Sequence, residues 1–497
     1  MVVQHNMQAA NANRMLNVTT SAQSKSTEKL SSGYRINRAA DDAAGLTISE
    51  KMRKQIRGLD QASTNAQDGV SSVQTAEGAL TEVHSMLQRM NELATQAANG
   101  TNSKDSDRQA IQDEIDQLTT EIDRVSETTK FNETYLLKGE AGTKTINMKA
   151  HDAGLKGTLT DNGDGTATFV MDTLNAGDKV SIGGKNYTIG GTLDDLDSAF
   201  GTNGLDINTN HQDISVNGTT YKYYDDTVTT KDGNKITAGY YSADPSKLAD
   251  QAAATATGVD GKVTADLAAL KTNAPAGSTI TVGTKTVTLM KDDGTKGGTA
   301  SDGIDDTDTT VISKKKAYEL ASKELLKANQ IGDTKGSAKI ENAATKADGS
   351  FKITTGQAEV ANSLSFSLHV GADADMTNKI HVNIDAMDSA SLGIKGLNVK
   401  DASGNAATYA VDAISDAISK VSSQRSSLGA VQNRLEHTIN NLDNVVENTT
   451  TAESRIRDTD MAEEMVNYSK NNILAQAGQS MLAQANQSNQ GVLSLLQ

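Results

Sequence analysis

Apolar and small residues recur at alternating steps of three and four from Leu59 onward. One seam consists of Leu59, Ala66, Val73, Leu80, Leu87 and Ala94. A partner seam consists of Ala62, Gly69, Ala76, Val83, Met90 and Ala97. This period is typical of a coiled-coil helix, and the small residues permit a close approach of a second helix. We therefore predict one long helix, which the polar stretch 99–107 ends.

The same period returns twice more, far apart along the chain. The first run consists of Ile111, Ile115, Leu118, Ile122 and Val125. The second consists of Ile414, Val421, Leu428, Leu435 and Leu442, with Ile418, Val431 and Val445 in its second seam. The pattern predicts a helical bundle that is built from both ends of the chain.

The middle of the chain, residues 141–361, has a different pattern. It is rich in Gly, Thr, Asp and Asn, and it contains both prolines. Alternating apolar and polar positions predict strands at 166–172, 213–224 and 278–290, and one amphipathic helix at 314–330. Asn217-Gly218 is a hairpin signal, because glycine tolerates positive φ. We predict an α+β protein: a coiled-coil helical rod from both chain ends, with a mainly β insertion.

The extreme ends carry almost no charge. Residues 471–497 contain no charged side chain and ten Asn and Gln residues, and the first thirteen residues contain only His5. A transmembrane helix is one interpretation, but each buried amide would need a partner in lipid. Apolar residues at helical spacing among amides favour packed helix interiors instead. Because two such helices cannot cover each other fully, we predict that further copies of the chain supply the missing partners.

Composition and charge disfavour several classes of function. The net charge of −16 disfavours nucleic-acid binding and docking on anionic membranes. The chain has no Cys, so it has neither disulfides nor thiol chemistry. Its first residues lack the charged start and apolar run of a secretory signal. The protein therefore stays in the cell or leaves by a route that needs no cleaved peptide.

Sequence motifs for catalysis or metal binding are absent. The seven histidines are scattered, and none starts the His-Glu-x-x-His pattern of a zinc protease. Residues 161–172 hint at a calcium loop, but Gly163 and Gly165 stand where oxygen ligands are needed. No Gly-rich phosphate-binding loop occurs. We predict a protein that is not an enzyme and needs no cofactor or metal.

Two polar blocks, 37–46 and 454–460, interrupt the helical pattern. Their clustered Arg and Asp are either a solvated hinge or contacts that join two helical parts. The second interpretation involves Arg35, Arg38, Asp41, Asp42, Arg455, Arg457, Asp458 and Asp460. Only a network would add much stability, since single exposed ion pairs contribute little.

Several long blocks resemble bacterial flagellin, the subunit of the flagellar filament. They include KSTEKLSSGYRINRAADDAAGLTISEKMRKQIRGL (25–59), EIDRVSETTKFN (121–132) and RLEHTINNLDNVVENTTTAESRIRDTDMAEEMVNYSKNNIL (434–474). The resemblance covers roughly residues 1–140 and 362–497. It favours the network interpretation of the two polar blocks. It also implies five parts: an N-terminal inner-tube helix (1–42), an N-terminal rod (43–140), the variable insertion (141–361), a C-terminal rod with a hairpin (362–455) and a C-terminal inner-tube helix (456–497).

The resemblance implies self-assembly into an extracellular helical filament for swimming. The assembly residues would be Val3, Met7, Ile473, Met481, Val492, Leu493 and Leu496. The implied partners are an export chaperone and secretion apparatus, hook-junction and cap proteins, and other copies of the chain. A hook–filament junction protein is the alternative within the same family. A coiled-coil signalling receptor is an alternative from another class, but it would need a membrane span.

Flagellins of many bacteria are recognised by a Toll-like innate immune receptor of the host. The segments 87–96 and 110–115 resemble those that carry this recognition, which maps the receptor contacts onto Arg89, Leu93 and Glu114. Leu93 lies beside the heptad seams, so it need not be buried in the rod's own core. Asn91 departs from the family pattern, in which an Arg is found, and this departure predicts weaker recognition or signalling.

Overall fold

A computed structural model describes residues 6–99, 105–200, 211–229, 231–233, 235, 238–241, 276–293, 301–341, 349–401 and 403–494. The chain divides into two compact units. The first contains Met1–Thr75, Ser365–Asn383 and Ser427–Gln497, and the second contains Ala76–Leu364 and Ile384–Ser426. Two long helices, α2 (Ala43–Ala98) and α10 (Asn405–Arg457), contribute residues to both units.

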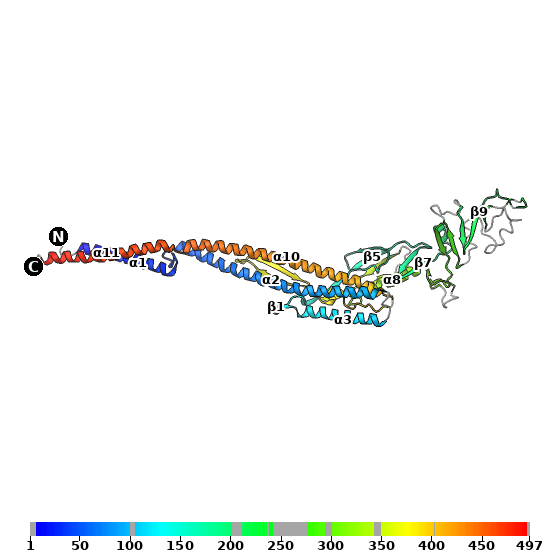
Figure 1. The fold of residues 1–497 in the computed structure, drawn as a ribbon, viewed down its shortest axis with the longest axis horizontal. Coiled ribbons are helices and arrows are strands. Elements are labelled where there is room, and N and C mark those ends of the chain that lie inside the picture. Colours follow the sequence, from blue (N-terminus) through cyan, green and yellow to red (C-terminus); the bar gives the residue numbers. More distant parts are fainter. Residues whose placement is uncertain are drawn as a thin grey trace. The chain divides into compact units, whose positions relative to one another are not determined.

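The first unit pairs helices from the two ends of the chain. Helix α1 (Met7–Ser32) lies beside α11 (Met461–Ser494), as Figure 1 shows in blue and red. Asn6 caps the start of α1, because its side chain accepts the N–H of Ala9. Gly33 ends α1 in the left-handed conformation, at φ 75°.

The first part of α2 packs on the last part of α10 and on a hairpin. The hairpin consists of β17 (Leu364–His369) and β18 (Lys379–Ile384), joined by a loop with the short helix η4 (Met376–Asn378). Its apolar core holds Ala66, Val370, Ile380 and Leu435. The side chain of Asn65 also donates to the main-chain oxygen of His369 at 3.0 Å.

The second unit contains the remaining parts of α2 and α10 together with α3 (Asp105–Thr128) and the short α9 (Ser389–Leu392). Eleven of the twelve predicted seam positions of α2 are buried, and Leu59 is half-buried. The first seam of α10 is buried throughout, while Val445 of its second seam is 39% exposed. The predicted bundle of long helices from both chain ends is confirmed.

Helix α3 is fixed by two polar side chains that are themselves buried. Gln112 donates to the oxygen of Leu397 at 2.9 Å and accepts the N–H of Val399 at 2.8 Å. Arg108, 1% exposed, donates to the oxygen of Asp401 at 2.5 Å. Buried polar groups are stable only when paired, so these contacts hold the loop before α10 against α3.

The insertion is mainly β, as predicted. A four-stranded sheet has the order β14-β15-β5-β4, where β14 is Lys339–Glu341, β15 Ser350–Thr354, β5 Thr166–Met171 and β4 Gly157–Asp161. A three-stranded sheet has the order β13-β7-β6, where β13 is Val311–Ile312, β7 Lys185–Ile189 and β6 Lys179–Ile182. Helix α8 (Lys314–Asn329) confirms the amphipathic helix, and Ser313 caps it.

A five-stranded sheet has the order β10-β9-β8-β11-β12. Its strands are β8 Ile214–Val216, β9 Thr219–Tyr224, β10 Gly239–Tyr241, β11 Thr279–Val282 and β12 Lys285–Thr288, with α4 (Asp195–Phe200) beside β12. Two-residue turns join β8 to β9 and β11 to β12, and Asn217 and Gly218 have φ of 50° and 85°. The predicted strands and the Asn-Gly hairpin are confirmed.

Two smaller pairings are also present: β3 (Glu140–Asn147) with β16 (Gln357–Asn362), and β1 (Lys130–Phe131) with β2 (Thr134–Tyr135). Two of the apolar cores described in the insertion are separate from each other. The proximal core includes Phe169, Phe351 and Tyr409, and the last of these belongs to α10. The distal core includes Phe200, Tyr221 and Ile280. The proximal core therefore packs part of the insertion against a long helix.

Candidate functional site

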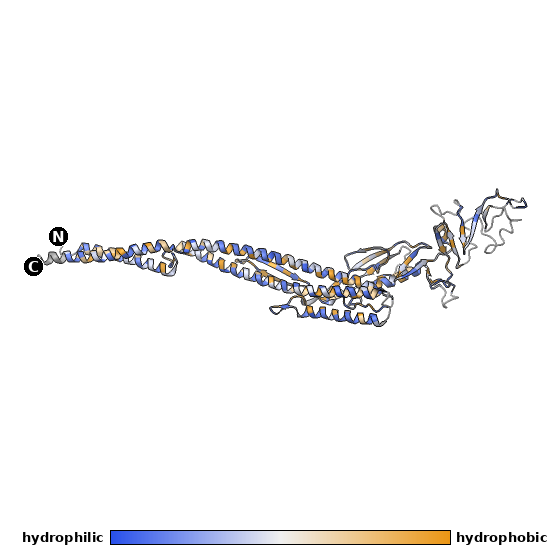
Figure 2. Cartoon of the chain, in the orientation of Figure 1, coloured by the Kyte–Doolittle hydropathy of each residue, from blue (hydrophilic) through white to orange (hydrophobic). Residues whose placement is uncertain are grey.

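The α1–α11 pair exposes most of its apolar side chains. Met7 is 74% exposed, Ile473 67% and Met481 61%, and the other large exposed apolar residues of the pair are Met15, Val18, Met461, Met465, Val466 and Leu474. Among the described side chains of the two helices, only Ser26 and Ala475 are buried. Apolar positions recur along both helices in Figure 2. Continuous exposed apolar surface of this kind marks an interaction surface.

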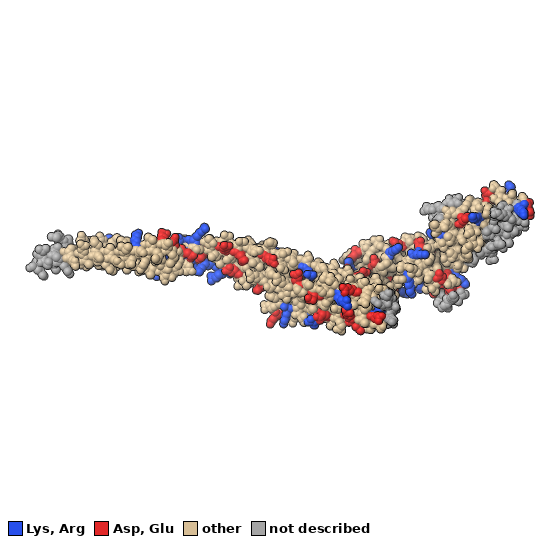
Figure 3. Space-filling model, viewed as in Figure 1, with Lys and Arg blue, Asp and Glu red and all other residues tan. Residues whose placement is uncertain are grey.

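The same helices carry few charges. In α1 these are Arg14, Lys25, Glu28 and Lys29, and α11 has none after Lys470. On the face drawn in Figure 3, the pair is accordingly almost uncharged. Few long-range polar bonds hold the pair: Asn6 donates to the oxygen of Ala485 at 3.1 Å, and Lys29 lies 3.8 Å from Glu464.

Helices α1 and α11 pack closely but bury few side chains between them. At Gly478 a Cβ atom would lie 3.3 Å from Leu16, so the glycine lets α1 approach. Burying a large apolar side chain contributes about 1.5–3 kcal/mol, and this pair leaves that contribution largely unused. Predicted residues Met7, Ile473 and Met481 lie on its exposed surface. Val3, Leu496 and the side chains of Val492 and Leu493 lie outside the described residues.

Main-chain bonds join the two polar blocks where the helices break. Tyr34 and Asp458 form an antiparallel β-bridge, the N–H of Arg35 donates to the oxygen of Arg457 at 2.6 Å, and Thr459 donates to the oxygen of Gly33 at 3.0 Å. The Arg35 side chain donates to the oxygen of Ile456 at 2.5 Å. The Arg457 guanidinium stacks over the Tyr34 ring at 4.7 Å.

The aspartates of these blocks act locally. Asp41 accepts the N–H groups of Arg38 and Asn37, and these bonds lower the pKa of its carboxyl. Asp42 and Asp460 cap the starts of α2 and α11 through main-chain N–H groups. Arg38 pairs with Glu28 at 2.9 Å, and Asp458 accepts a hydrogen bond from the Ser454 hydroxyl. Arg455 is exposed and has no ion pair in the described part of the chain.

Arg89 and Glu114 lie next to each other and join α2 to α3. The Arg89 Nε lies 2.8 Å from Glu114 Oε1, and its Nη1 lies 3.2 Å from Glu92, which the sequence analysis did not single out. Their side chains are half exposed. Leu93 is buried, with only 2% exposed, so the possibility that it lies outside the rod's core is ruled out. It follows Arg89 by one helical turn, so it lies on the side of α2 that α3 covers.

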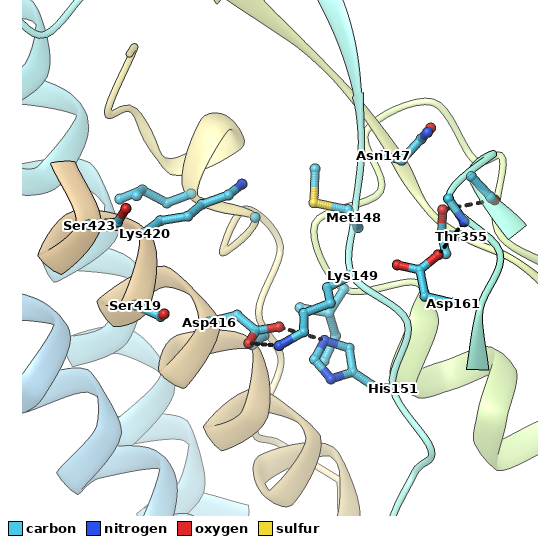
Figure 4. Close-up of a pocket in the computed structure, with 16 residues that line it drawn as sticks. Asn147, Met148, Lys149, His151, Asp161, Thr355, Asp416, Ser419, Lys420 and Ser423 are labelled. Atoms are coloured by element: carbon cyan, nitrogen blue, oxygen red, sulfur yellow. Dashed lines mark hydrogen bonds and ion pairs between the residues drawn. The ribbon is translucent and has the colours of Figure 1, made fainter. Parts of the chain in front are cut away.

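A second candidate is a cavity of about 430 Å³ between α10 and the segment 147–165 (Figure 4). Three of its polar side chains lie together: Lys149 Nζ lies 2.8 Å and His151 Nε2 3.7 Å from the Asp416 carboxylate. Lys420 donates to the oxygen of Ser391 at 2.9 Å. The Tyr409 hydroxyl nearby donates to Glu324 at 2.9 Å, and burial together with this carboxylate raises the pKa of Tyr409 far above its usual range. These contacts anchor the insertion to α10.

No described helix combines the length and apolarity that a membrane span requires. A family model for the bacterial flagellin N-terminal helical region matches residues 3–142, and one for the C-terminal helical region matches residues 411–496. Flagellin of Clostridium tyrobutyricum is 38% identical and covers 99% of this chain and 100% of its own. Flagellin of Bacillus subtilis strain 168 is 35% identical, with 100% of both chains covered. Flagellin of Salmonella typhimurium is 37% identical, with 97% and 96% covered.

These comparisons define a helical, self-assembling class of filament proteins. The chain belongs to the bacterial flagellin family. It is a structural subunit that assembles into the flagellar filament used for swimming, and the resemblance seen in the sequence is confirmed. A hook–filament junction protein is not favoured, because relatives named flagellin match nearly the whole chain.

Proposed function

We propose that the exposed apolar surface of the α1–α11 pair is where subunits join in the inner tube of the filament. The observation that carries this proposal is the exposure of Met7, Ile473 and Met481 on helices with almost no charge. Val3, Val492, Leu493 and Leu496 extend the same pattern in the sequence. Polymerisation would bury this surface against neighbouring copies, since many copies provide the partners that one chain lacks.

Deletion of residues 471–497 tests this proposal. The truncated protein should fail to elongate filament seeds, while the far-UV circular dichroism of its α2–α10 part stays helical. Residues 192–288, called the distal lobe below, contain none of the proposed surface. Their deletion is the control, and it should leave the elongation of seeds unchanged. Elongation by the protein without residues 471–497 at the wild-type rate would contradict the proposal.

The five-part division and the junction belong to the same proposal. Residues 1–42 and 456–497 would form the inner tube, residues 43–140 and 362–455 the rod, and residues 141–361 the outer domain. Arg35 and Arg457 would hold tube to rod, because both contact the opposite segment at the level where the helices break. The aspartate caps beside them would fix where α2 and α11 begin.

The wider setting follows from the family. The subunit would be exported through the flagellum's own channel without a cleaved signal peptide, in contact with a chaperone, and would polymerise outside the cell beneath a cap protein and beyond the hook junction. It would act without catalysis, cofactor or metal. Mass spectrometry of shed filaments tests the export route: a subunit that lacks an N-terminal peptide would contradict it.

A host Toll-like receptor is the second proposed partner of the monomer. Arg89 and Glu114 support it, because their half-exposed ion pair presents two charged groups on one surface of α2 and α3. Arg side chains are frequent hot spots, so Arg89→Ala should weaken binding to the receptor ectodomain about tenfold. Asn91→Arg should strengthen it. Equal affinity of wild type and Arg89→Ala would remove this surface as the recognition site.

A further inference from the structure

We propose that Asn162 is a site of spontaneous deamidation, which adds negative charge to the insertion as the protein ages. This proposal is independent of assembly and of receptor recognition. Asn162 and Gly163 lie in the tight connection between β4 and β5, and both are exposed. Strand β4 is the edge of its sheet.

The chemistry needs no enzyme. The main-chain nitrogen of Gly163 attacks Cγ of the Asn162 side chain, the N–H proton passes to solvent base, and ammonia leaves. The product is a five-membered succinimide. Water then adds to either carbonyl carbon, which opens the ring to aspartate or isoaspartate. Glycine favours the first step because it has no Cβ to crowd the attacking nitrogen.

The contacts of Asn162 leave this route open. Apart from its two chain neighbours, no described residue has an atom within 4 Å of the position that a Cβ at Gly163 would take. The Gly163 N–H donates to Asp161 Oδ1 at 2.9 Å, so it already points to a proton acceptor. The Asn162 Nδ2 donates only to the hydroxyls of Thr166 and Thr168, at 3.0 and 3.4 Å. Water replaces such exposed bonds at little cost, so the carboxamide is free to turn toward Gly163.

Asn217-Gly218 is an internal comparison with the same two residues. It is also exposed and also lies in a hairpin turn. However, Asn217 Oδ1 accepts the N–H of Thr279 at 2.9 Å, and its Nδ2 donates to the hydroxyl of buried Ser278 at 3.3 Å. Turning this carboxamide toward Gly218 would break contacts that start β11. We therefore infer that Asn217 is protected while Asn162 reacts.

The product changes the local charge. Deamidation places a new carboxylate between Asp161 and Asp164 in a chain that is already acidic. Asp161, Gly163 and Gly165 line the cavity of Figure 4, so the new charge lies at its edge. Older subunits would thus differ from new ones in the outer domain and not in the helices that carry assembly.

Peptide mapping by mass spectrometry tests the proposal on the full-length protein. Samples are stored at pH 8 and pH 6, and aspartate and isoaspartate are measured at residues 162 and 217. We expect conversion at Asn162 that is several times faster than at Asn217, and faster at pH 8, because the attacking nitrogen must lose its proton. The Asn162→Gln variant should lose the part of the acidic charge variant that peptide mapping assigns to residue 162.

Urea-denatured protein is the reference, because unfolding removes the hydrogen bonds that distinguish the Asn162 side chain from the Asn217 side chain. There, Asn162-Gly163 and Asn217-Gly218 should convert at similar rates. If native Asn162 stays intact while the denatured chain converts, or if native Asn217 converts as fast as Asn162, the proposal is wrong.

Discussion

Leu368 of β17 packs directly against Gly69 of α2, so closely that a Cβ at position 69 would lie 2.2 Å from Leu368 Cδ1. Gly69→Ala would force Leu368 out of a packed core. Overpacking costs roughly 1–3 kcal/mol, and alanine regains up to about 1 kcal/mol of helix propensity. We expect a net loss of about 1–2 kcal/mol of unfolding free energy, measured by urea denaturation.

Gly78 is a matched control on the same helix. Apart from its chain neighbours and the adjacent backbone of α2 itself, no described atom lies within 4 Å of a Cβ built there. Gly78→Ala should raise the unfolding free energy by about 0.5–1 kcal/mol, since only the helix propensity changes. If the two variants have equal stability, the hairpin does not depend on the close approach at Gly69.

Asp333 makes the insertion sensitive to acid. Burial alone would raise the pKa of Asp333, but the N–H groups of Ala338, Gln357 and Lys335 outweigh it, and the pKa lies below its usual 3.8. A carboxyl with a lowered folded pKa stabilises the fold above its unfolded pKa, and this stabilisation disappears as the pH falls through the folded value. We expect stability to fall below about pH 4.

Asp333→Asn separates this effect from general acid unfolding. The variant should lose about 1–3 kcal/mol at pH 7, because one amide cannot accept all of these hydrogen bonds. Its stability should then depend less steeply on pH below about pH 4 than that of the wild type. Parallel slopes in thermal unfolding at pH 3 to 7 would contradict the role of this carboxylate.

The distal lobe should be removable. Its chain enters and leaves at one place, because Gly191 and Leu289 form a parallel β-bridge and the N–H of Met290 donates to the oxygen of Gly191 at 3.0 Å. Its core is separate from the proximal one. Replacing residues 192–288 by a short Gly/Ser linker should preserve filament assembly and the proximal core.

Replacing residues 150–355 is a harsher change. Tyr409 of α10 is 5% exposed because the proximal core covers it. The larger deletion should therefore lower the melting temperature of the helical part, and the smaller one should not. Electron microscopy and calorimetry of both variants distinguish these outcomes, and identical melting would show that the insertion adds nothing to α10.

Leu93 and Arg89 should respond differently to substitution by alanine. Leu93 is 2% exposed, so Leu93→Ala should cost about 2–5 kcal/mol of stability. Arg89 is half exposed, and its replacement should change stability little. Thermal unfolding checks both. A loss of receptor binding by the Leu93 variant is informative only at a temperature where that variant is fully folded.

Periodicity predicted the parts of the fold that repeat. The seams of α2 and α10 could be read because each buried position recurs every seven residues. The strands of the insertion followed from alternation and from the Asn-Gly turn. The order of the strands in the five-stranded sheet could not be predicted from the sequence, since it depends on contacts between residues distant in sequence.

The candidate site was predictable in part. The absence of charge after Lys470 is a property of the sequence alone, and it indicated the exposed apolar surface of α11. The burial of Leu93 was not predicted because neither heptad seam of α2 includes it, whereas α3 adds a further neighbour to α2. The partners of Arg35 could not be predicted from the sequence for another reason: they are main-chain oxygens, which every residue carries.

The exposed surface of α11 is the central claim, and one assay tests it most directly: the rate of seeded polymerisation of Ile473→Asp. Ile473 is 67% exposed in the free chain, so the substitution should leave the monomer's helical content unchanged. In the filament, an unpaired carboxylate would be buried at several kcal/mol, and elongation should stop. Leu193→Asp, at an apolar residue that is 40% exposed in the distal lobe, should elongate like the wild type. Wild-type elongation by Ile473→Asp would contradict the account.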